Sequence, residues 1–264
     1  MKKLISIIII TLILNLTYAQ KADTIFTHQK TIICNIKEIA SENIKYSYPN
    51  ENILISLNKN MITKIIYSSG REEVFSESLG FKKISGWEDW EKVATSIIPD
   101  EVDGLYKLGD ISSKAKGGTG FSNQNKLKNK AVRKIKIRAA MIGANVVYIA
   151  SDDTEGVAYG KTAQVIMTGV GYSNRIVNID TFKKLIKGKP IWRLSNIVSM
   201  PFNSKTPTTT SGNNVTMDLS NYRVDGLFIK MIYKNEIYRV INIDNNQITL
   251  MKQDKRKTYN YILK

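Results

Sequence analysis

Short runs in which apolar and polar residues alternate fill the chain from residue 22 to residue 75. Alternation with a period of two is typical of strands that bury one face, and polar or turn residues separate these runs. Five or six short strands in this segment indicate a small, strongly bent sheet or an SH3-like barrel. The predicted strands span residues 24–28, 32–39, 44–48, 53–57, 62–67 and 73–75.

The pattern changes to a helical period in the middle of the chain. Residues 122–142 carry an apolar side chain at about every fourth position, which predicts a helix with one buried face. We expect Ser122 to cap its start and Gly143 to supply the left-handed residue after its end. One strand before the helix and two after it give the order β-α-β-β, in which the helix packs on one face of a small sheet. The predicted strands span residues 104–112, 145–150 and 162–172, and the apolar stripe is Leu127, Ala131, Ile135, Ala139 and Ile142.

The last part of the chain, residues 175–264, predicts a β-rich domain that begins with one short helix. Residues 181–187 are expected to form this helix, with Asp180 as its cap. The segment 203–214 is rich in Thr, Ser, Pro and Gly and predicts a flexible loop. The predicted strands span residues 226–233, 236–243, 247–251 and 258–263.

A connector over residues 77–102 contains Trp87 and Trp90. Their spacing suits a helix, while residues 92–98 could form a strand, and the period alone leaves both open. A pair of tryptophans can serve as a ligand platform, but covering a domain interface is the more common use. We expect the interface role here.

A faint internal repeat links the two β-rich ends of the chain at a constant offset of 204 residues. A duplicated hairpin and convergent strand–turn–strand patterns both explain it. The matched residues are Ile33, Ile36, Ile39 and Ile44 in the first copy and Ile237, Val240, Ile243 and Ile248 in the second.

The first nineteen residues have the organisation of a secretory signal peptide. Lys2 and Lys3 precede an apolar run over residues 4–16, and small residues follow it before a predicted cleavage site at Gln20. The run is shorter than the roughly 20 residues that a membrane span needs, and no later stretch is long and apolar enough. We therefore expect a mature chain, residues 20–264, without a transmembrane span. It would be exported to the periplasm, the outer envelope surface or the medium.

The chain is strongly basic, with 39 Lys and Arg against 23 Asp and Glu and a net charge of +16. Residues 105–150 hold most of the excess, with 10 basic residues and 1 acidic residue. Such a region can attract nucleic acid, lipid headgroups or envelope polymers. Lys outnumbers Arg 31 to 8 and lacks the planar fork that reads phosphates and guanine edges, so no nucleic-acid partner is expected. The coding bias of an AT-rich genome is the simpler explanation of the lysines.

The composition also removes several kinds of chemistry. With a single histidine, His28, and a single cysteine, Cys34, the chain cannot form an internal disulfide or a Cys/His zinc site. Residues 156–162 resemble a phosphate loop, but three residues separate the glycines where that motif needs four. The acidic run at 152–155 offers too few ligands for Ca²⁺. We expect no catalytic residue, no metal and no cofactor, and a carboxylate hydrolase is the least expected class.

Two stretches resemble known protein families, of which the second has exported and cytosolic members. Residues 22–75 look like a β-rich domain that follows the signal peptide in many exported bacterial proteins, which implies no catalytic residue. The segments KLKNKAVRKIKIRAAMIGANVVYIAS and KTAQVIMTGVGYS are similar to the YbjQ/RcsF-like superfamily of small α/β domains. Some members of that superfamily are described as metal-binding, and one stress sensor is stapled by disulfides. Neither property is carried over, because this block has no His, no clustered acids and no Cys.

Pattern and resemblance together predict an α+β protein with a small β-barrel-like N-terminal domain, a central β-α-β-β domain and a C-terminal β-rich domain. The predicted boundaries are 1–19 for the signal peptide, 20–76 for the first domain, 77–102 for the connector, 103–174 for the YbjQ/RcsF-like domain and 175–264 for the last domain.

We expect a non-enzymatic binding protein of the cell envelope or the secreted fraction, which engages a protein, lipid headgroups or an anionic surface polymer. A structural accessory protein without a ligand of its own is the alternative. If the basic helix is the contact surface, reversing the charges of Lys130, Lys134 and Arg138 should abolish retention on anionic vesicles or cell-wall polymer without lowering the melting temperature. The candidate anion-contact residues are Lys126, Lys130, Arg133, Lys134 and Arg138.

Overall fold

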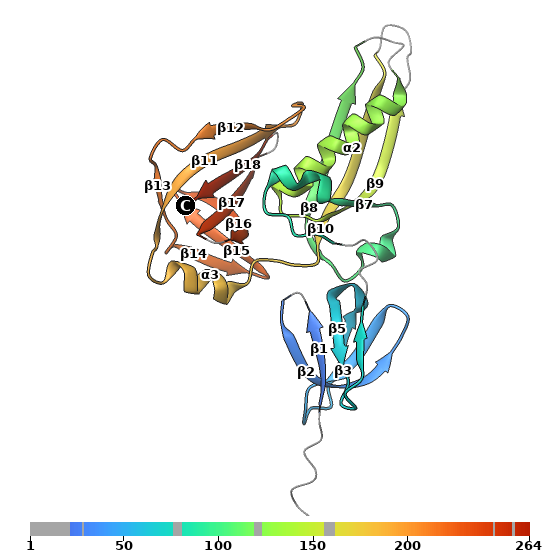
Figure 1. The fold of residues 1–264 in the computed structure, drawn as a ribbon. Coiled ribbons are helices and arrows are strands. Elements are labelled where there is room, and N and C mark those ends of the chain that lie inside the picture. Colours follow the sequence, from blue (N-terminus) through green and yellow to red (C-terminus); the bar gives the residue numbers. More distant parts are fainter. Residues whose placement is uncertain are drawn as a thin grey trace, which may run out of the picture. The chain divides into compact units, whose positions relative to one another are not determined.

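The computed structural model is mostly β-sheet with few helices (Figure 1). It divides into two compact units, residues 1–76 and 77–264. The predicted signal peptide, His28, Ser122 and residues 156–161 of the phosphate-loop-like motif lie outside the described residues. The described residues are 22–27, 29–75, 81–118, 123–155, 162–244, 246–254 and 257–264.

The N-terminal unit is an antiparallel sheet of six strands. They are β1 (Asp23–Thr27), β2 (Thr31–Ile39), β3 (Asn43–Ser47), β4 (Ile55–Asn58), β5 (Ile62–Ile66) and β6 (Glu72–Val74), with a 3₁₀ turn, η2 (Lys59–Met61), before β5. The order in the sheet is β4-β3-β2-β1-β5-β6. All six predicted strands are present, with small shifts of their ends. The described residues show no pairing between the edge strands β4 and β6, so the sheet is open and the expected barrel is not closed.

The core of the N-terminal unit consists of side chains at alternate strand positions. Ile25, Ile44 and Ile65 are fully buried, and Cys34 lies among them with no exposed surface. Because only one face of the sheet is buried, apolar and polar residues alternate along the strands, and this alternation predicted where the strands lie.

We expect the Cys34 thiol to be inert in the folded protein. Burial, and to a smaller extent the charge of Asp23, raises the pKa of Cys34 to about 11. Ellman's reagent should therefore react at pH 8 far more slowly with native protein than with the unfolded chain. Because folding favours the protonated thiol, its contribution to stability is complete below about pH 9 and is lost as the pH rises towards 11.

A Cys34→Ala variant is the control for this titration, since it should lose less stability than the wild type between pH 9 and pH 11. Fast labelling of native protein at pH 8, at a rate independent of unfolding, would contradict the burial of the thiol.

The second unit begins with a central lobe in which one helix packs on a four-stranded sheet (Figure 1). Its elements are η3 (Trp87–Lys92), β7 (Ala94–Ser96), η4 (Pro99–Val102), β8 (Tyr106–Lys116), α2 (Gln124–Met141), β9 (Val146–Glu155) and β10 (Gln164–Ser173). The sheet order is β7-β9-β10-β8, with β7 parallel to β9 and the other pairs antiparallel. The predicted order β-α-β-β is therefore present as β8-α2-β9-β10. The connector contains both a short helix and a short strand, and the acidic run at 152–155 belongs to β9 rather than to a turn.

The helix α2 has the predicted apolar stripe but a different N-cap. The side-chain oxygen of Asn123 accepts a hydrogen bond from the backbone N–H of Lys126 at 3.1 Å, so Asn123 takes the place expected of Ser122. Gly143 has a φ of 81° and supplies the left-handed residue after the helix, as predicted. All five residues of the stripe are buried against the sheet: Leu127, Ala131, Ile135, Ala139 and Ile142.

Replacing Ala139 with Leu is expected to cost about 1–3 kcal/mol of stability, because the larger side chain would overpack the contact between α2 and the sheet. Ala139 is fully buried within this core. Urea denaturation of the full chain measures the effect. The matched control is Asn129→Leu on the exposed side of the same helix, which should stay within about 0.5 kcal/mol of the wild type. Equal midpoints for the Ala139→Leu variant and the wild type would mean that Ala139 faces solvent.

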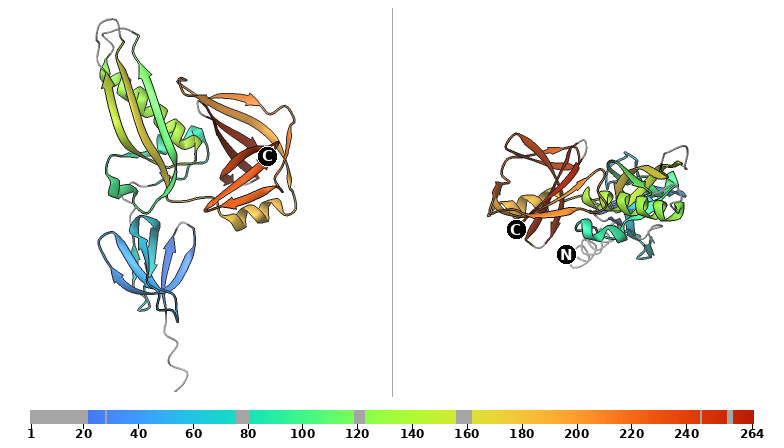
Figure 2. Two further views of the ribbon diagram at one scale, coloured as in Figure 1. Left: turned by 180° about the vertical axis from the view of Figure 1, so that it is seen from behind. Right: turned by 90° about the horizontal axis from the view of Figure 1, so that it is seen from above.

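The rest of the second unit is a C-terminal lobe, a bent sheet with one helix at its side (Figure 2). Its elements are α3 (Ile179–Ile186), β11 (Ile191–Pro201), β12 (Thr208–Ser211), β13 (Thr216–Asp218), β14 (Tyr222–Asp225), β15 (Phe228–Tyr233), β16 (Glu236–Asp244), β17 (Gln247–Asp254) and β18 (Lys257–Leu263). The sheet order is β12-β11-β18-β17-β16-β15-β14, and β13 pairs with β11. Phe182 of α3 and Trp192 of β11 are almost completely buried in the core of this lobe.

Three details of the C-terminal lobe differ from the prediction. The side chain of Asn178 caps α3 by accepting a hydrogen bond from the backbone N–H of Thr181 at 2.9 Å, and Asp180 lies inside the first turn. The expected loop over residues 203–214 contains β12. The strands β11, β13 and β14 were not predicted. In β11 the apolar residues face two different cores, since Trp192 and Leu194 lie in the core of the lobe and Val198 and Met200 pack against α2.

The internal repeat extends to the geometry of two hairpins. The hairpins β2–β3 and β16–β17 have the same pairing register at the same offset of 204 residues, and each carries one bulged residue at the matching position. Alternation alone does not require a bulge at a fixed place, so the match favours a duplicated hairpin over convergence. The matching pairs are Ile36–Tyr46 with Val240–Leu250 and Ile39–Ile44 with Ile243–Ile248, and the bulged residues are Lys37 and Ile241.

Candidate anion-binding site

The two lobes of the second unit meet at the C-terminal end of α2. Ile137 and Met141 of the helix pack against Val198 and Met200 of β11, and all four are almost completely buried. Both tryptophans of η3 pack against this cluster, which is the interface role expected of them. One face of α2 therefore lies on its own sheet, and a second face lies on the neighbouring lobe.

The C-terminal lobe also caps the helix. The last carbonyl groups of a helix have no partner within it. Here the side-chain amide of Asn260 donates to the carbonyl oxygen of Met141 at 2.8 Å. The guanidinium of Arg239 donates to the carbonyl oxygens of Ile142 at 2.8 Å and Leu108 at 2.7 Å. A cation at this position also interacts favourably with the negative end of the helix dipole.

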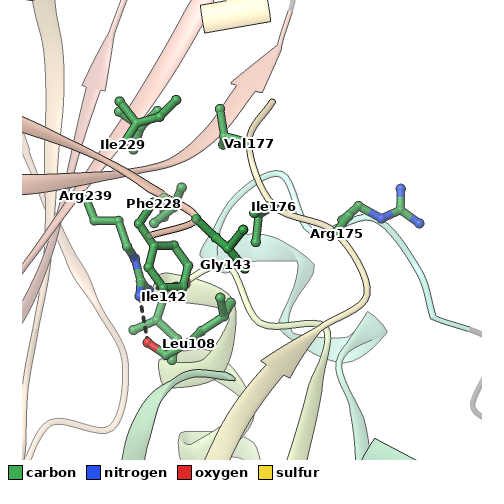
Figure 3. A pocket seen from close by; sticks show the side chains of 12 residues that line it. Leu108, Ile142, Gly143, Arg175, Ile176, Val177, Phe228, Ile229 and Arg239 are labelled. Atoms are coloured by element: carbon green, nitrogen blue, oxygen red, sulfur yellow. Dashed lines mark hydrogen bonds between the residues drawn. The ribbon is translucent and has the colours of Figure 1, made fainter. Parts of the chain in front are cut away.

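Arg239 occupies a narrow crevice between the lobes. Figure 3 shows its side chain directed towards Leu108, with Phe228 beside it and Arg175 pointing away. The guanidinium carbon lies 5.1 Å from the centre of the Phe228 ring. Burial lowers the pKa of Arg239 to about 10, so the group stays charged at neutral pH. The free space in this crevice is about 20 Å³, close to that of a single water, so the crevice is a structural junction rather than a ligand site.

Arg138 makes the reciprocal contact from the central lobe. Its Nη2 donates to the carbonyl oxygen of Pro201 at 2.9 Å, and its guanidinium carbon lies 5.1 Å from the centre of the Phe202 ring. Only 7% of Arg138 is exposed, so its predicted place on a solvated anion-contact face is wrong. The physical reason is that the end of β11 covers this part of α2.

Three of the five predicted contact residues share one hollow on the surface of the second unit, with a volume of about 360 Å³. We call it the basic concavity. Lys116 reaches it from the end of β8, and Lys205 reaches it from the segment between β11 and β12. Its described lining contains no acidic residue. The lining residues are Lys116, Lys130, Arg133, Lys134 and Lys205, with Ala115, Gly117 and Gly118.

Lys134 is the buried member of the basic concavity. It is 7% exposed, and its Nζ donates to the carbonyl oxygen of Lys114 at 2.6 Å. Its pKa is lowered, first by burial and then by the positive charges of Arg138, Lys205 and Lys130. We therefore now expect reversal of the charges of Lys134 and Arg138 to lower the stability, because both side chains are buried.

The exposed members of the basic helix differ in their surroundings. Lys126 lies in the first turn of α2, outside the lining of the concavity. Arg133 is exposed, and its guanidinium carbon lies 5.2 Å from the centre of the Trp90 ring, a contact that restrains the side chain. Lys128 forms an ion pair with Asp152, so its charge is offset. The exposed positive charge is thus concentrated on Lys126, Lys130 and Arg133.

Sequence reasoning did not select Lys116 and Lys205 as candidates. Each lies in a segment without helical period, and only tertiary structure brings them to α2. The available signal was the charge count, since residues 176–205 carry 6 basic residues and 1 acidic residue.

The described part of the chain holds no group of three or more His, Cys, Asp or Glu side chains that could bind a metal ion. Among the same residues, none of the helices has the length and apolar character required to span a bilayer.

In comparisons with known proteins, the chain matches no family model, no curated protein and no solved structure, so its likeness to YbjQ/RcsF-like domains stays a prediction.

Proposed function

We propose that this protein is a non-enzymatic, exported binding protein that holds an anionic polymer of the cell envelope at the basic concavity. The observation that supports the proposal is that five Lys and Arg residues from three separate segments line one hollow whose described lining is free of acidic residues. Lys130 and Lys205 act on Lys134 as like charges and lower its pKa, and an anionic ligand would offset this repulsion. Export rests on the predicted signal peptide over residues 1–19.

A polymer suits the surroundings of the concavity better than an isolated small ion. Lys126 continues the exposed positive charge along α2 beyond Lys130 and Arg133. A chain of repeated negative charges can contact the concavity and this extension together, which a single ion cannot do. The alternative, a structural accessory protein without a ligand of its own, predicts no retention on such a polymer.

The triple variant Lys126→Glu, Lys130→Glu and Arg133→Glu is expected to lose retention on heparin and on phosphatidylglycerol vesicles at low salt. Wild-type retention should weaken as salt rises above about 0.1 M, where the screening length falls to about 10 Å. All three side chains are exposed, so the variant should lose no more than about 1 kcal/mol of stability, mainly from the Arg133–Trp90 contact. Column elution and thermal melts measure the two quantities.

The matched control is Lys183→Glu, Lys184→Glu and Lys257→Glu, which makes the same change of net charge at three exposed positions outside the concavity. It should keep most of the retention. An equal loss in both triple variants would show that only net charge matters. If the triple variant in α2 is retained as well as the wild type, this surface does not contact the polymer. That result would favour the alternative of a structural accessory protein without a ligand of its own.

A further inference from the structure

We propose that the basic concavity recognises a phosphomonoester group on the bound polymer, and that the bound group joins the two lobes of the second unit through Lys205. This inference rests on the proposed function and names the chemical group that the site selects.

The number of cations favours a doubly charged group. A carboxylate carries one negative charge, whereas a phosphomonoester carries about 1.5–2 at neutral pH and presents three acceptor oxygens. The planar guanidinium of Arg133 can hold two of those oxygens, and lysine ammonium groups can approach the third as point charges. The five cationic side chains of the lining supply this combination.

The burial of Lys134 supplies a second and independent reason. A charged group removed from water is costly unless an opposite charge or sufficient hydrogen bonds replace the water. The ammonium has three donors, and the carbonyl oxygen of Lys114 takes one of them. The charged groups that act on Lys134, namely Lys130, Arg138 and Lys205, are all positive and lower its pKa. A phosphate group in the concavity would provide the missing negative charge.

The origin of the lining residues explains how binding would join the lobes. Lys116 comes from β8, and Lys130, Arg133 and Lys134 come from α2, all in the central lobe. Lys205 belongs to the C-terminal lobe, shortly after Pro201, whose carbonyl oxygen already accepts the hydrogen bond from Arg138. The volume of about 360 Å³ lies at the lower end of the range for small-molecule pockets, so it can admit a phosphate with a glycerol-sized group attached.

The test is isothermal titration of the mature chain with sn-glycerol 3-phosphate, inorganic phosphate and acetate at matched ionic strength. We expect glycerol 3-phosphate to bind at least about tenfold more tightly than acetate, because its additional charge and oxygens engage more cations. Lys205→Gln and Lys116→Gln should each weaken its binding by at least about fivefold, while the exposed control Lys183→Gln should bind like the wild type. Hydrogen exchange should show that the ligand protects residues 130–134 of α2 and residues 202–205 in the wild type but not in the Lys205→Gln variant.

Three results would overturn the inference. Equal affinity for glycerol 3-phosphate and acetate would remove the preference for phosphate. If inorganic phosphate binds as tightly as glycerol 3-phosphate, the concavity binds the free ion and does not recognise a phosphomonoester on a polymer. Hydrogen exchange that does not change at a saturating ligand concentration would contradict the proposal that the bound group joins the two lobes. Heparin carries sulfates and carboxylates but no phosphate. If one of these three results is found and the wild-type protein is still retained on heparin, the proposed function stands without the phosphate inference. If the wild-type protein is not retained on heparin, the proposed function and the phosphate inference are both refuted.

Discussion

Replacement of Arg239 by Met is expected to destabilise the second unit by about 3–5 kcal/mol. The methionine leaves the carbonyl oxygens of Leu108 and Ile142 without their donor, and a buried carbonyl without a partner costs about 1–3 kcal/mol. It also removes a cation from the end of α2, which adds up to about 2 kcal/mol. Urea denaturation followed by tryptophan fluorescence measures the loss, because Trp87 and Trp90 lie near the junction and Trp192 lies in the core of the C-terminal lobe.

Two further variants make this result specific. Arg223→Met removes an exposed arginine from β14 and should stay within about 0.5 kcal/mol of the wild type. Arg239→Lys should recover only part of the loss, because a single ammonium lacks the planar fork that reaches two carbonyl oxygens at once. A wild-type midpoint for Arg239→Met would contradict the role of Arg239 as the cap of α2.

The Gly169→Ala substitution is expected to cost about 3–4 kcal/mol and to lower the melting temperature by about 6–15 °C. A Cβ atom at Gly169 would lie 2.3 Å from the carbonyl oxygen of Tyr148, a backbone atom of the neighbouring strand. Since β10 is paired on both sides, with β8 and with β9, it cannot move away from one partner without disturbing the other.

Gly188→Ala is the matched control for this clash, because a Cβ atom there would meet no other atom within 4 Å. It should melt within about 2 °C of the wild type. If both alanine variants melt together, the close approach of β9 and β10 at Gly169 is wrong.

The elements that sequence reasoning located correctly are those with one buried face and local end signals. Most strands of the N-terminal unit alternate because one face of the sheet covers the core, and α2 shows its period because Leu127, Ala131 and Ile135 all meet the same sheet. The strand β11 was not predicted because it buries residues on two sides, Leu194 in the core of its own lobe and Val198 against α2. Closure of a sheet depends on how its edge strands meet, which alternation along one strand does not encode.

The candidate site was predicted in part for a related reason. A helical period reveals the stripe that packs on the helix's own sheet, but it carries no information on a second face covered by residues much later in the chain. Lys134 and Arg138 lie on that second face, so their charge suggested solvent exposure although both are buried. Lys130 and Arg133 are exposed and line the basic concavity, and their contact with an anion stays a prediction.

The capping of α2 by the C-terminal lobe sets the order of events during synthesis. Arg239 follows Ile142 by 97 residues, and Asn260 follows Met141 by 119 residues. At about 5–20 residues per second, translation delivers these side chains roughly 5–25 s after the helix itself. Throughout that interval the apolar side chains of Ile137 and Met141, which β11 and β18 later cover, lack part of their final packing. The central lobe can therefore complete its packing only after the last three strands, β16 to β18, are present.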